Sequence, residues 1–393
     1  MAGITITREA QLPDPLRVSR ALSMPHLGPR ILFFSGGSAL NGIARALKRY
    51  THNSVHLVTP FDSGGSSQTL RLAFDMPAVG DLRSRLMALA DESVLGQPDI
   101  YALFSHRLPK LGASADLAAE VAAMAAGRHP LVRAVAMPMR RLIRSFLQDF
   151  TARAPRDFDY RNASIGNLII AGGYLSNDRA LEPVLFLMSK MVDVRGTVRA
   201  VVDANLQLGV ELEDGRILTG QREITGKEVA PLETRILRAF LSGEAGEIAP
   251  QQLRLPGRNR ALIGAADLIC YPPGSLYSSV VANLLPAGVG RAVAARRVPK
   301  IYLPGLGSDP EALGHAPADR VAALLAPLCR DAGPDARPRD LITHVLCDPR
   351  WSGTERREIT ARHGIDCVTL PLAGAQPDRY DPRRVCDMLV SLA

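Results

Sequence analysis

The 393-residue sequence is poor in aromatic side chains, which make up 5% of it and include a single Trp. A platform of stacked aromatic rings for single-stranded nucleic acid is therefore poorly supported. Cysteine is also scarce, and none of the five cysteines forms a CxxC pair. They are Cys270, Cys329, Cys347, Cys367 and Cys386. We expect buried free thiols in a reducing cytoplasm rather than disulfides or a zinc site.

Several catalytic and targeting patterns are missing as well. No apolar stretch is long enough to span a bilayer, and no signal-peptide pattern opens the sequence. HExxH and GxSxG do not occur, so a zinc protease and a serine hydrolase are not supported. Among the eight histidines only His106 is kept as a site candidate. We therefore expect a cytoplasmic protein that does not associate with membranes.

The charge balance is positive, because 47 Lys and Arg face 39 Asp and Glu, a net charge of +8. Such a balance favours anionic partners such as phosphates or nucleic acid. The basic residues do not form one long run, however, and an arginine-rich proteome would give the same balance. We rank nucleic-acid binding low for this reason.

Buried strands alternate with helical patterns along much of the chain. The apolar run 31–34 precedes a Ser-Gly-Gly-Ser loop and apolar residues at helical spacing, and 55–58 forms the next short strand. This order is the opening of a doubly wound, mostly parallel, Rossmann-like α/β sheet. Further strands are expected at 265–270, 300–303, 341–346 and 365–370.

Three segments depart from this alternation. Residues 1–28 carry three prolines and no clear periodicity, so we expect an extended N-terminal arm before one α/β domain at 29–393. Residues 111–160 are Ala-rich and then Arg-rich, which predicts a helical insertion that serves as a lid or as an arm for a homo-oligomer. Residues 192–256 alternate in part and contain the hairpin signal Asp-Gly at 214–215, which predicts a small β-rich insertion.

Loops of small residues follow three of the predicted strands. Glycine lets a backbone approach a phosphate closely, and a helix N-terminus then offers free N–H donors. Neither GxGxxG nor a Walker lysine is present, and each loop alone is equally well explained as a tight turn or a helix cap. Three such loops at strand ends can nevertheless converge on one crevice. The candidate phosphate-binding residues are Gly36, Gly37, Ser38, Gly64, Gly65, Ser66, Gly274 and Ser275.

Charged residues accompany the second loop. Asp62 follows the strand at 55–58, where it could hold Mg²⁺, a ribose hydroxyl or a substrate proton, although a plain surface loop explains it equally well. Arg71 and Arg83 could pair with a phosphate, and the common alternative is an exposed arginine on a helix. Asp81 precedes an apolar helical pattern and is a candidate N-cap.

Taken together and in order, these motifs resemble the CofD/YvcK family over residues 30–310. The matching segments are Ser35–Ser38, Asp62–Ser67, Gly80–Arg83, Gly166–Leu168, Val194–Val198 and Gly274–Ser279. The CofD branch of that family moves a phospholactyl group from a guanosine-diphosphate-linked donor onto a deazaflavin alcohol, with Mg²⁺. The YvcK branch binds UDP-sugars and regulates cell-wall and carbon metabolism.

The resemblance implies a nucleotide-binding transferase that moves a phosphate-linked group from a nucleotide-diphosphate-linked donor to an acceptor hydroxyl. It implies a catalytic and Mg²⁺-holding role for Asp62, and adds Asp81, Asn167 and Tyr277 to the nucleotide- and phosphate-binding residues. The alternative is a non-catalytic, YvcK-like regulatory protein that binds a UDP-sugar through the same loops. The chain departs from the family at Ser63, where a second aspartate is usual, and this bears directly on Mg²⁺ binding.

Overall fold

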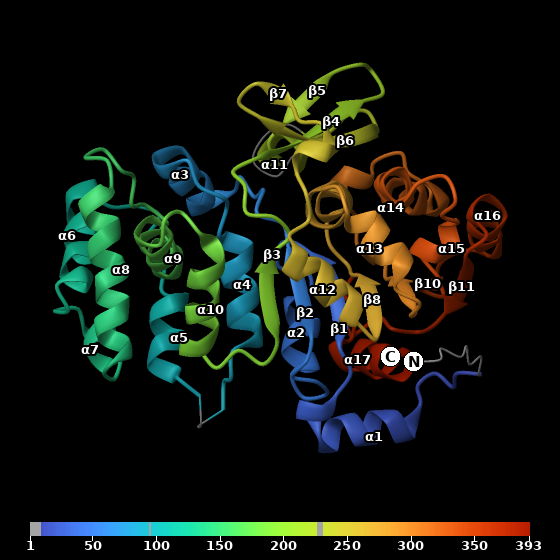
Figure 1. Cartoon of the computed structure of the whole chain (residues 1–393), viewed down its shortest axis with the longest axis horizontal. Helices are drawn as coiled ribbons and strands as arrows, with labels where there is room; N and C mark the ends of the chain where they lie inside the picture. The colour runs from blue at the N-terminus through green and yellow to red at the C-terminus, as the bar shows by residue number, and fades with distance from the viewer. Residues whose placement is uncertain (1–8, 94–95, 226–230) are drawn as a thin grey trace.

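Seven short strands pair side by side into one parallel sheet (Figure 1). The computed structural model describes residues 9–93, 96–225 and 231–393. The strands of this sheet are β1 (Ile31–Ser35), β2 (Val55–Val58), β3 (Thr197–Ala200), β8 (Leu268–Tyr271), β9 (Lys300–Tyr302), β10 (His344–Cys347) and β11 (Asp366–Thr369). Their order is β11-β10-β9-β8-β1-β2-β3, and every pair is parallel. This arrangement confirms the predicted fold class.

Helices cover both faces of the sheet. Successive side chains of β1 point to opposite faces, so each set packs against a different group of helices. Leu32 and Phe34 pack with the apolar side chains of α12, α13 and α14, whereas Ile31 and Phe33 pack with those of α2 and α17. The helices in the described chain are α1 (Pro15–Ser23), α2 (Asn41–Leu47), α3 (Gly65–Phe74), α4 (Gly80–Leu89), α5 (Pro98–Ser105), α6 (Ser114–Ala125), α7 (Pro130–Ala134), α8 (Met139–Arg153), α9 (Ile165–Ser176), α10 (Leu181–Met191), α11 (Gln221–Thr225), α12 (Gly257–Ala265), α13 (Val289–Ala295), α14 (Pro317–Ala332), α15 (Pro338–Leu341), α16 (Gly353–His363) and α17 (Pro382–Leu392).

The strand order reverses direction between β1 and β8. From β1 the chain adds β2 and β3 on one side, and from β8 it adds β9, β10 and β11 on the other. The loops that leave the carboxyl ends of β1 and β8 therefore run to opposite sides and leave a crevice between them, where open α/β sheets bind their ligands. The fold thus places the first and third predicted loops on the two sides of one switch point.

A second, antiparallel sheet lies beside the carboxyl edge of the first (Figure 1). Its strands, in spatial order, are β5 (Ile217–Thr219), β4 (Gln207–Leu212), β6 (Ile236–Gly243) and β7 (Gly246–Glu247). The Asp-Gly hairpin joins β4 to β5, and Gly215 has the left-handed φ of 83° that the turn requires. The predicted boundary at residue 192 is too early, because Thr197–Ala200 pairs with β2 as the edge strand β3. A half-exposed edge strand and an antiparallel strand give the same alternating pattern, so periodicity could not separate them.

The N-terminal arm predicted at 1–28 is largely helical where the structure describes it. Pro15 opens α1, and the carboxylate of Asp14 accepts hydrogen bonds from the backbone amides of Leu16 at 3.0 Å and Arg17 at 3.1 Å. Proline at the first position of a helix does not break it, which the prediction overlooked. Helix α1 packs on α17 at the other end of the chain. Residues 1–8 lie outside the described residues.

The predicted helical insertion at 111–160 holds α6, α7 and α8, which lie to one side of the sheet (Figure 1). Helix α8 packs on α9, and α6 and α7 pack on α8. Gly172 lies where α9 crosses α8, and a Cβ atom built there would be 1.8 Å from the carbonyl oxygen of Phe146. Only glycine allows the two backbones to come this close. This crossing anchors the insertion to α9, the helix that also carries Asn167.

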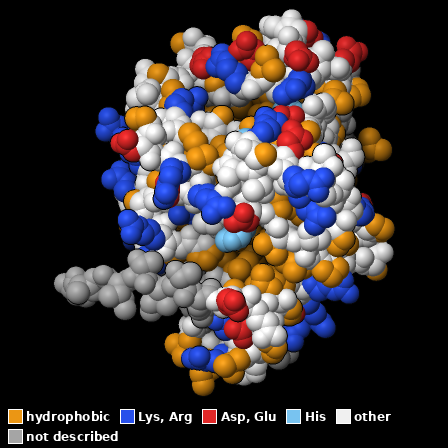
Figure 2. All heavy atoms as spheres, turned by 90° about the vertical axis from the view of Figure 1, so that its right-hand side faces the viewer, with side chains coloured by type: hydrophobic (Ala, Val, Ile, Leu, Met, Phe, Trp, Pro, Cys, Tyr) orange, Lys and Arg blue, Asp and Glu red, His pale blue; other side chains and the backbone are white. Residues whose placement is uncertain are grey.

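The remaining global predictions concern thiols, membranes and charge. All five cysteines are free thiols, but only Cys270, Cys347 and Cys386 are buried, whereas Cys329 and Cys367 are partly exposed. None of the helices in the described parts of the chain is long and apolar enough to cross a membrane. Figure 2 shows that the Lys and Arg side chains on one face form separate groups, with acidic side chains among them.

Gly172→Ala is expected to lower the free energy of unfolding by about 3 kcal/mol, because overpacking against a fixed backbone carbonyl cannot be relieved by a rotamer change. Gly264→Ala is the matched control, since nothing lies within 4 Å of a Cβ built at this position in α12. Denaturant titration of both variants checks the prediction. Equal stabilities of the two variants would show that α8 and α9 are not closely packed in solution.

Candidate functional site

The loops after β1, β2 and β8 meet at the carboxyl edge of the sheet. A Cβ atom built on Gly36 would lie 2.7 Å from the hydroxyl oxygen of Thr59, at the end of β2, and 3.1 Å from the Cα atom of Ser279, after β8. Gly37 has a φ of 60°, a left-handed conformation that favours glycine. Glycines at 36 and 37 therefore allow three separate loops to converge, as the sequence predicted.

Asp81 links α4 to the first loop. Its Oδ2 atom accepts a hydrogen bond from the backbone amide of Gly37 at 2.6 Å. The predicted role of Asp81 as an N-cap is wrong, because α4 begins at Gly80 and its N-cap residue is Val79. The Gly37 amide that was predicted to face a phosphate is thus already bound to a carboxylate.

Asp62, in the second loop, lies close to the start of α4. Its Oδ1 atom accepts a hydrogen bond from the Gly64 amide at 2.9 Å, and its Oδ2 atom is 3.2 Å from the position of a Cβ built on Gly80. Burial, and after it the negative charge of Asp62, raise the pKa of Asp81 to about 6. The two carboxyl groups therefore form an electrostatically linked pair beside the first loop.

A hydrogen-bonded chain connects the second loop to the helical part of the molecule. The Nε atom of Arg83 donates to the Oδ1 atom of Asn167 at 2.8 Å, and the Nδ2 atom of Asn167 donates to the hydroxyl of Ser66 at 3.1 Å. Burial lowers the pKa of Arg83 to about 10, with a further contribution from the positive charge of Arg107. Arg83 stays cationic at neutral pH, and the structure brings three predicted residues, from α3, α4 and α9, into contact.

Arg71 lies behind the second loop, as predicted, but its guanidinium is bound to protein acceptors. Its guanidinium is buried and donates to the carbonyl oxygen of Leu206 at 2.7 Å and to the side chain of Asn205 at 3.0 Å. It also reaches the carbonyl oxygens of Phe61 at 3.4 Å and Asp62 at 3.3 Å. These contacts assign Arg71 to support of the second loop rather than to a phosphate.

The third loop leads into a helical turn whose first backbone amides already have hydrogen-bond acceptors within the protein. The Leu276 amide donates to the Oδ2 atom of Asp309 at 2.7 Å. The amides of Tyr277 and Ser278 both donate to the Oε2 atom of Glu311 at 2.8 Å. Burial raises the pKa of Glu311 to about 7, and the charge of Asp309 adds to the effect. Carboxylates from the loop after β9 thus occupy the position where a phosphate was predicted.

The side chain of Tyr277 is also engaged, at the second sheet. Its buried hydroxyl contacts the Nε2 atom of His315 at 2.9 Å and donates to the carbonyl oxygen of Ile236 at 3.3 Å. The predicted nucleotide contact of Tyr277 is therefore not available to its hydroxyl in this conformation. Gly274 and Ser275 do remain at the surface of the crevice.

We call this crevice the switch-point cleft. It has a volume of about 640 Å³ and lies between the loops after β1, β8 and β9. Its lining includes Ser38, Gly274, Ser275, Asp309, Arg379 and Tyr380. The size is in the range of small-molecule sites. The last two of these residues come from the segment before α17, which the sequence prediction did not connect with the site.

Sequence reasoning also missed Arg85, Asp309 and Glu311. Arg85 is 1% exposed, and its Nη2 atom is 3.4 Å from the carbonyl oxygen of Gly37. Its charge opposes the rise in the pKa of Asp81, four residues earlier on the same helix. That i, i+4 spacing was a usable signal, whereas nothing local indicated that Asp309 and Glu311 would cap a distant turn.

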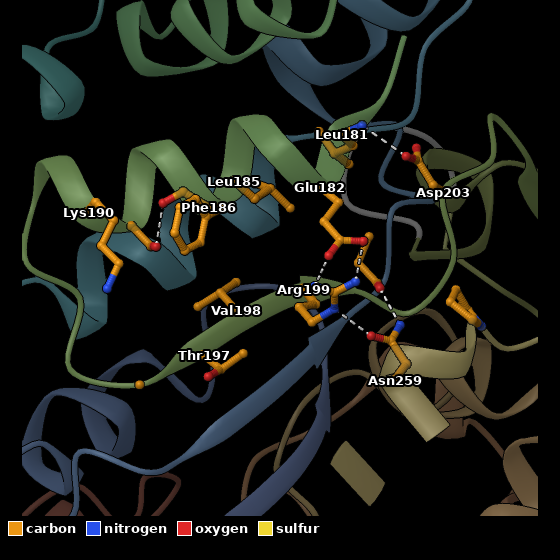
Figure 3. A pocket seen from close by; sticks show the side chains of 14 residues that line it. Leu181, Glu182, Leu185, Phe186, Lys190, Thr197, Val198, Arg199, Asp203 and Asn259 are labelled. Atoms are coloured by element: carbon orange, nitrogen blue, oxygen red, sulfur yellow. Dashed lines mark hydrogen bonds and ion pairs between the residues drawn. The ribbon is translucent and has the colours of Figure 1, made fainter. Parts of the chain in front are cut away.

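A separate hollow of about 230 Å³ lies between α10, the edge strand β3 and α12 (Figure 3). Glu182 and Arg199 meet there at 2.7 Å, and the Nε atom of Arg199 also donates to the side chain of Asn259 at 2.6 Å. None of the predicted site residues lines this hollow. Its principal charges neutralise each other, so it is the weaker candidate.

The fold and these loops define an α/β protein whose ligand site lies at the switch point of a parallel sheet. Residues 31–374 match the family described as 2-phospho-L-lactate transferase CofD. The match covers most of the chain, and the chain belongs to this family. The resemblance inferred from the motifs is therefore confirmed.

Relatives and a solved structure agree with this membership. The gluconeogenesis factor of Bacillus subtilis (strain 168) is 30% identical over 297 residues, which cover 75% of this chain and 74% of that protein. A putative gluconeogenesis factor of Nostoc sp. is 29% identical over 320 residues, which cover 80% of this chain but only 55% of that protein. A crystal structure of a UPF0052 family member from Bacillus halodurans has the same fold, with a TM-score of 0.66 and 23% identity, and the match covers 92% of this chain and 99% of that one.

The free energy of unfolding of an Asp81→Asn variant, minus that of the wild type, is expected to increase as the pH rises from about 4 to about 7. The folded-state pKa of about 6 exceeds the unfolded value of about 3.9. The ionised carboxyl therefore destabilises the wild type above pH 6, and this cost disappears as the pH falls below 4.

The asparagine variant lacks that titration, and melting temperatures of both proteins at pH 4, 5, 6 and 7 measure the difference. Asp335→Asn, an exposed change, is the control and should show no such trend. A difference that is independent of pH would contradict the raised pKa of Asp81.

Proposed function

We propose that this chain binds a nucleotide-diphosphate-linked ligand in the switch-point cleft and transfers a phosphate-linked group from it to an acceptor hydroxyl. The observation that carries the proposal is Asp81, which binds the Gly37 amide of the first glycine loop and whose pKa is raised by burial and by the neighbouring Asp62. The two carboxyl groups lie beside the cleft and are not among the residues that line it. The family description, a 2-phospho-L-lactate transferase, supports the same reaction class.

The carboxylate pair fits Mg²⁺, the cofactor that the family implies. Burial and the negative charge of Asp62 both raise the pKa of Asp81, and a bound cation would offset this repulsion. No group of three or more His, Cys, Asp or Glu side chains suited to a metal occurs among the described residues. This agrees with Mg²⁺, which commonly takes one or two carboxylates and completes its shell with water and substrate phosphate. Asp62 and Asp81 would hold the ion, which would offset the charge of the phosphates.

The reaction would depend mainly on positioning. The acceptor oxygen would form a bond to the distal phosphorus, the bond from that phosphorus to the bridging oxygen would break, and a nucleoside monophosphate would leave. Asp62 would orient the hydroxyl and take its proton. Arg83, cationic at neutral pH and fixed by Asn167, would stabilise the negative charge on the phosphoryl oxygens. Such transfers need little covalent chemistry from the protein.

The second candidate is a non-catalytic regulatory protein that binds a UDP-sugar in the same cleft. Two observations favour it: the relatives in Bacillus and Nostoc are described as gluconeogenesis factors, and the second loop has Ser63 beside Asp62 instead of a second aspartate. This candidate requires ligand binding without turnover and predicts that binding does not depend on Mg²⁺.

A thermal-shift screen separates the candidates. GDP, UDP and UDP-N-acetylglucosamine are tested with and without Mg²⁺, since a ligand that binds only the folded state raises the melting temperature. We expect a shift that needs Mg²⁺, that Asp62→Asn abolishes, and that the control Asp335→Asn retains. A UDP-sugar shift that is independent of Mg²⁺ would support the regulatory candidate instead.

Turnover is measured as release of nucleoside monophosphate from a diphosphate-linked donor of the nucleotide that gives the largest shift, with an alcohol present as the acceptor. We expect Asp62→Asn to lower the rate by at least about 100-fold, in the range seen when a positioned acid–base group is removed. Turnover at the wild-type rate in that variant would contradict the role of Asp62.

A further inference from the structure

A second hollow opens directly beside the switch-point cleft. It has a volume of about 690 Å³ and lies between α2 and the segment that leads into α17. The two hollows share Gly42, Arg379, Tyr380 and Pro382 in their lining, so they adjoin each other. We call this second hollow the arginine groove, after the four arginines that line it: Arg45, Arg49, Arg379 and Arg383.

The positive charge of the arginine groove is largely uncompensated. Within the described residues, the side chains of Arg49, Arg379 and Arg383 take part in no ion pair. Arg45 approaches Glu92 at 3.8 Å, but both side chains are nearly half exposed, and such pairs bind weakly. Four like charges around one hollow attract anions.

The one carboxylate that lines the groove is engaged elsewhere. The Oδ1 atom of Asp381 accepts hydrogen bonds from the backbone amides of Arg383 at 2.8 Å and Arg384 at 3.2 Å, and so caps α17. Its charge therefore serves the N-terminus of the helix. Burial lowers the pKa of Arg85 beneath the first loop, and the charge of Arg45 adds a smaller contribution in the same direction.

We propose that the arginine groove is a second anion subsite that binds a phosphate or carboxylate group carried by the ligand of the switch-point cleft. This inference rests on the proposed function, because it places that ligand in the cleft. Guanidinium groups bind both kinds of anion through paired hydrogen bonds. The groove is a single hollow that is confined to one part of the surface, so we expect its occupant to be a small polyanionic molecule rather than a nucleic acid.

The test uses calorimetric titration at low salt, without Mg²⁺, with two probes: tripolyphosphate for phosphates and citrate for carboxylates. The groove variant is Arg49→Gln with Arg383→Gln, both exposed positions. The control is Arg128→Gln with Arg133→Gln, which removes the same charge from exposed positions on the helical insertion. We expect the groove variant to bind the preferred probe about tenfold more weakly than the wild type, and the control to match the wild type within about twofold.

Three results would overturn the proposal: neither probe binds the wild type, the groove variant binds as well as the wild type, or both variants lose affinity equally. Duplex DNA that binds tightly and is weakened equally by both variants would show a diffuse basic surface, which also excludes the subsite. The melting-temperature shift with GDP and Mg²⁺ is measured in parallel. If the groove variant keeps the melting-temperature shift with GDP and Mg²⁺, nucleotide binding does not depend on the groove, and the proposed function holds whether or not the subsite does. If the wild type shows no shift but its binding of the probe depends on the groove, the nucleotide assignment fails while the subsite stands.

Discussion

The hydrogen bond from the Gly37 amide to Asp81 is the contact on which the arrangement of the site depends. It joins the first turn of α4 to the loop after β1, at the point where the order of the strands in the sheet reverses. A glycine is needed at 37 for the left-handed backbone, and the near approach of Thr59 and Ser279 to Gly36 leaves no room for a larger residue there. The loop, its carboxylate and the strands on either side are therefore fixed together.

This contact also explains why a carboxyl group sits beside a loop that was expected to hold phosphate. Burial and the charge of Asp62 make the ionised form of Asp81 costly, and Arg85 offsets only part of that cost. Such a pair is poorly stabilised by the protein alone and is suited to a cation that a phosphate ligand would share. The four arginines of the neighbouring groove, of which Arg45 alone forms an ion pair with a carboxylate among the described residues, carry positive charge where we propose that the ligand extends.

The sequence was sufficient for the fold because its signals are local. The apolar run that became β1, the Asp-Gly hairpin and the order of glycine loops each depend on a few neighbouring residues. The failures involve distant partners. Glu311 caps the turn at Tyr277 from 34 residues away, and Arg71 reaches Leu206 across 135 residues, so neither contact leaves a pattern in the sequence. Side-chain direction, rather than the placement of the loops, was what could not be predicted.

We propose that Asp62 and Asp81 form a cation site at the switch point. Anomalous scattering from crystals grown with GDP and Mn²⁺, a stand-in for Mg²⁺, tests this proposal. We expect one strong anomalous peak within coordination distance of both carboxylates and of a phosphate oxygen of the nucleotide. A nucleotide bound in the cleft with no peak at this pair, or with the metal at other residues, would contradict it.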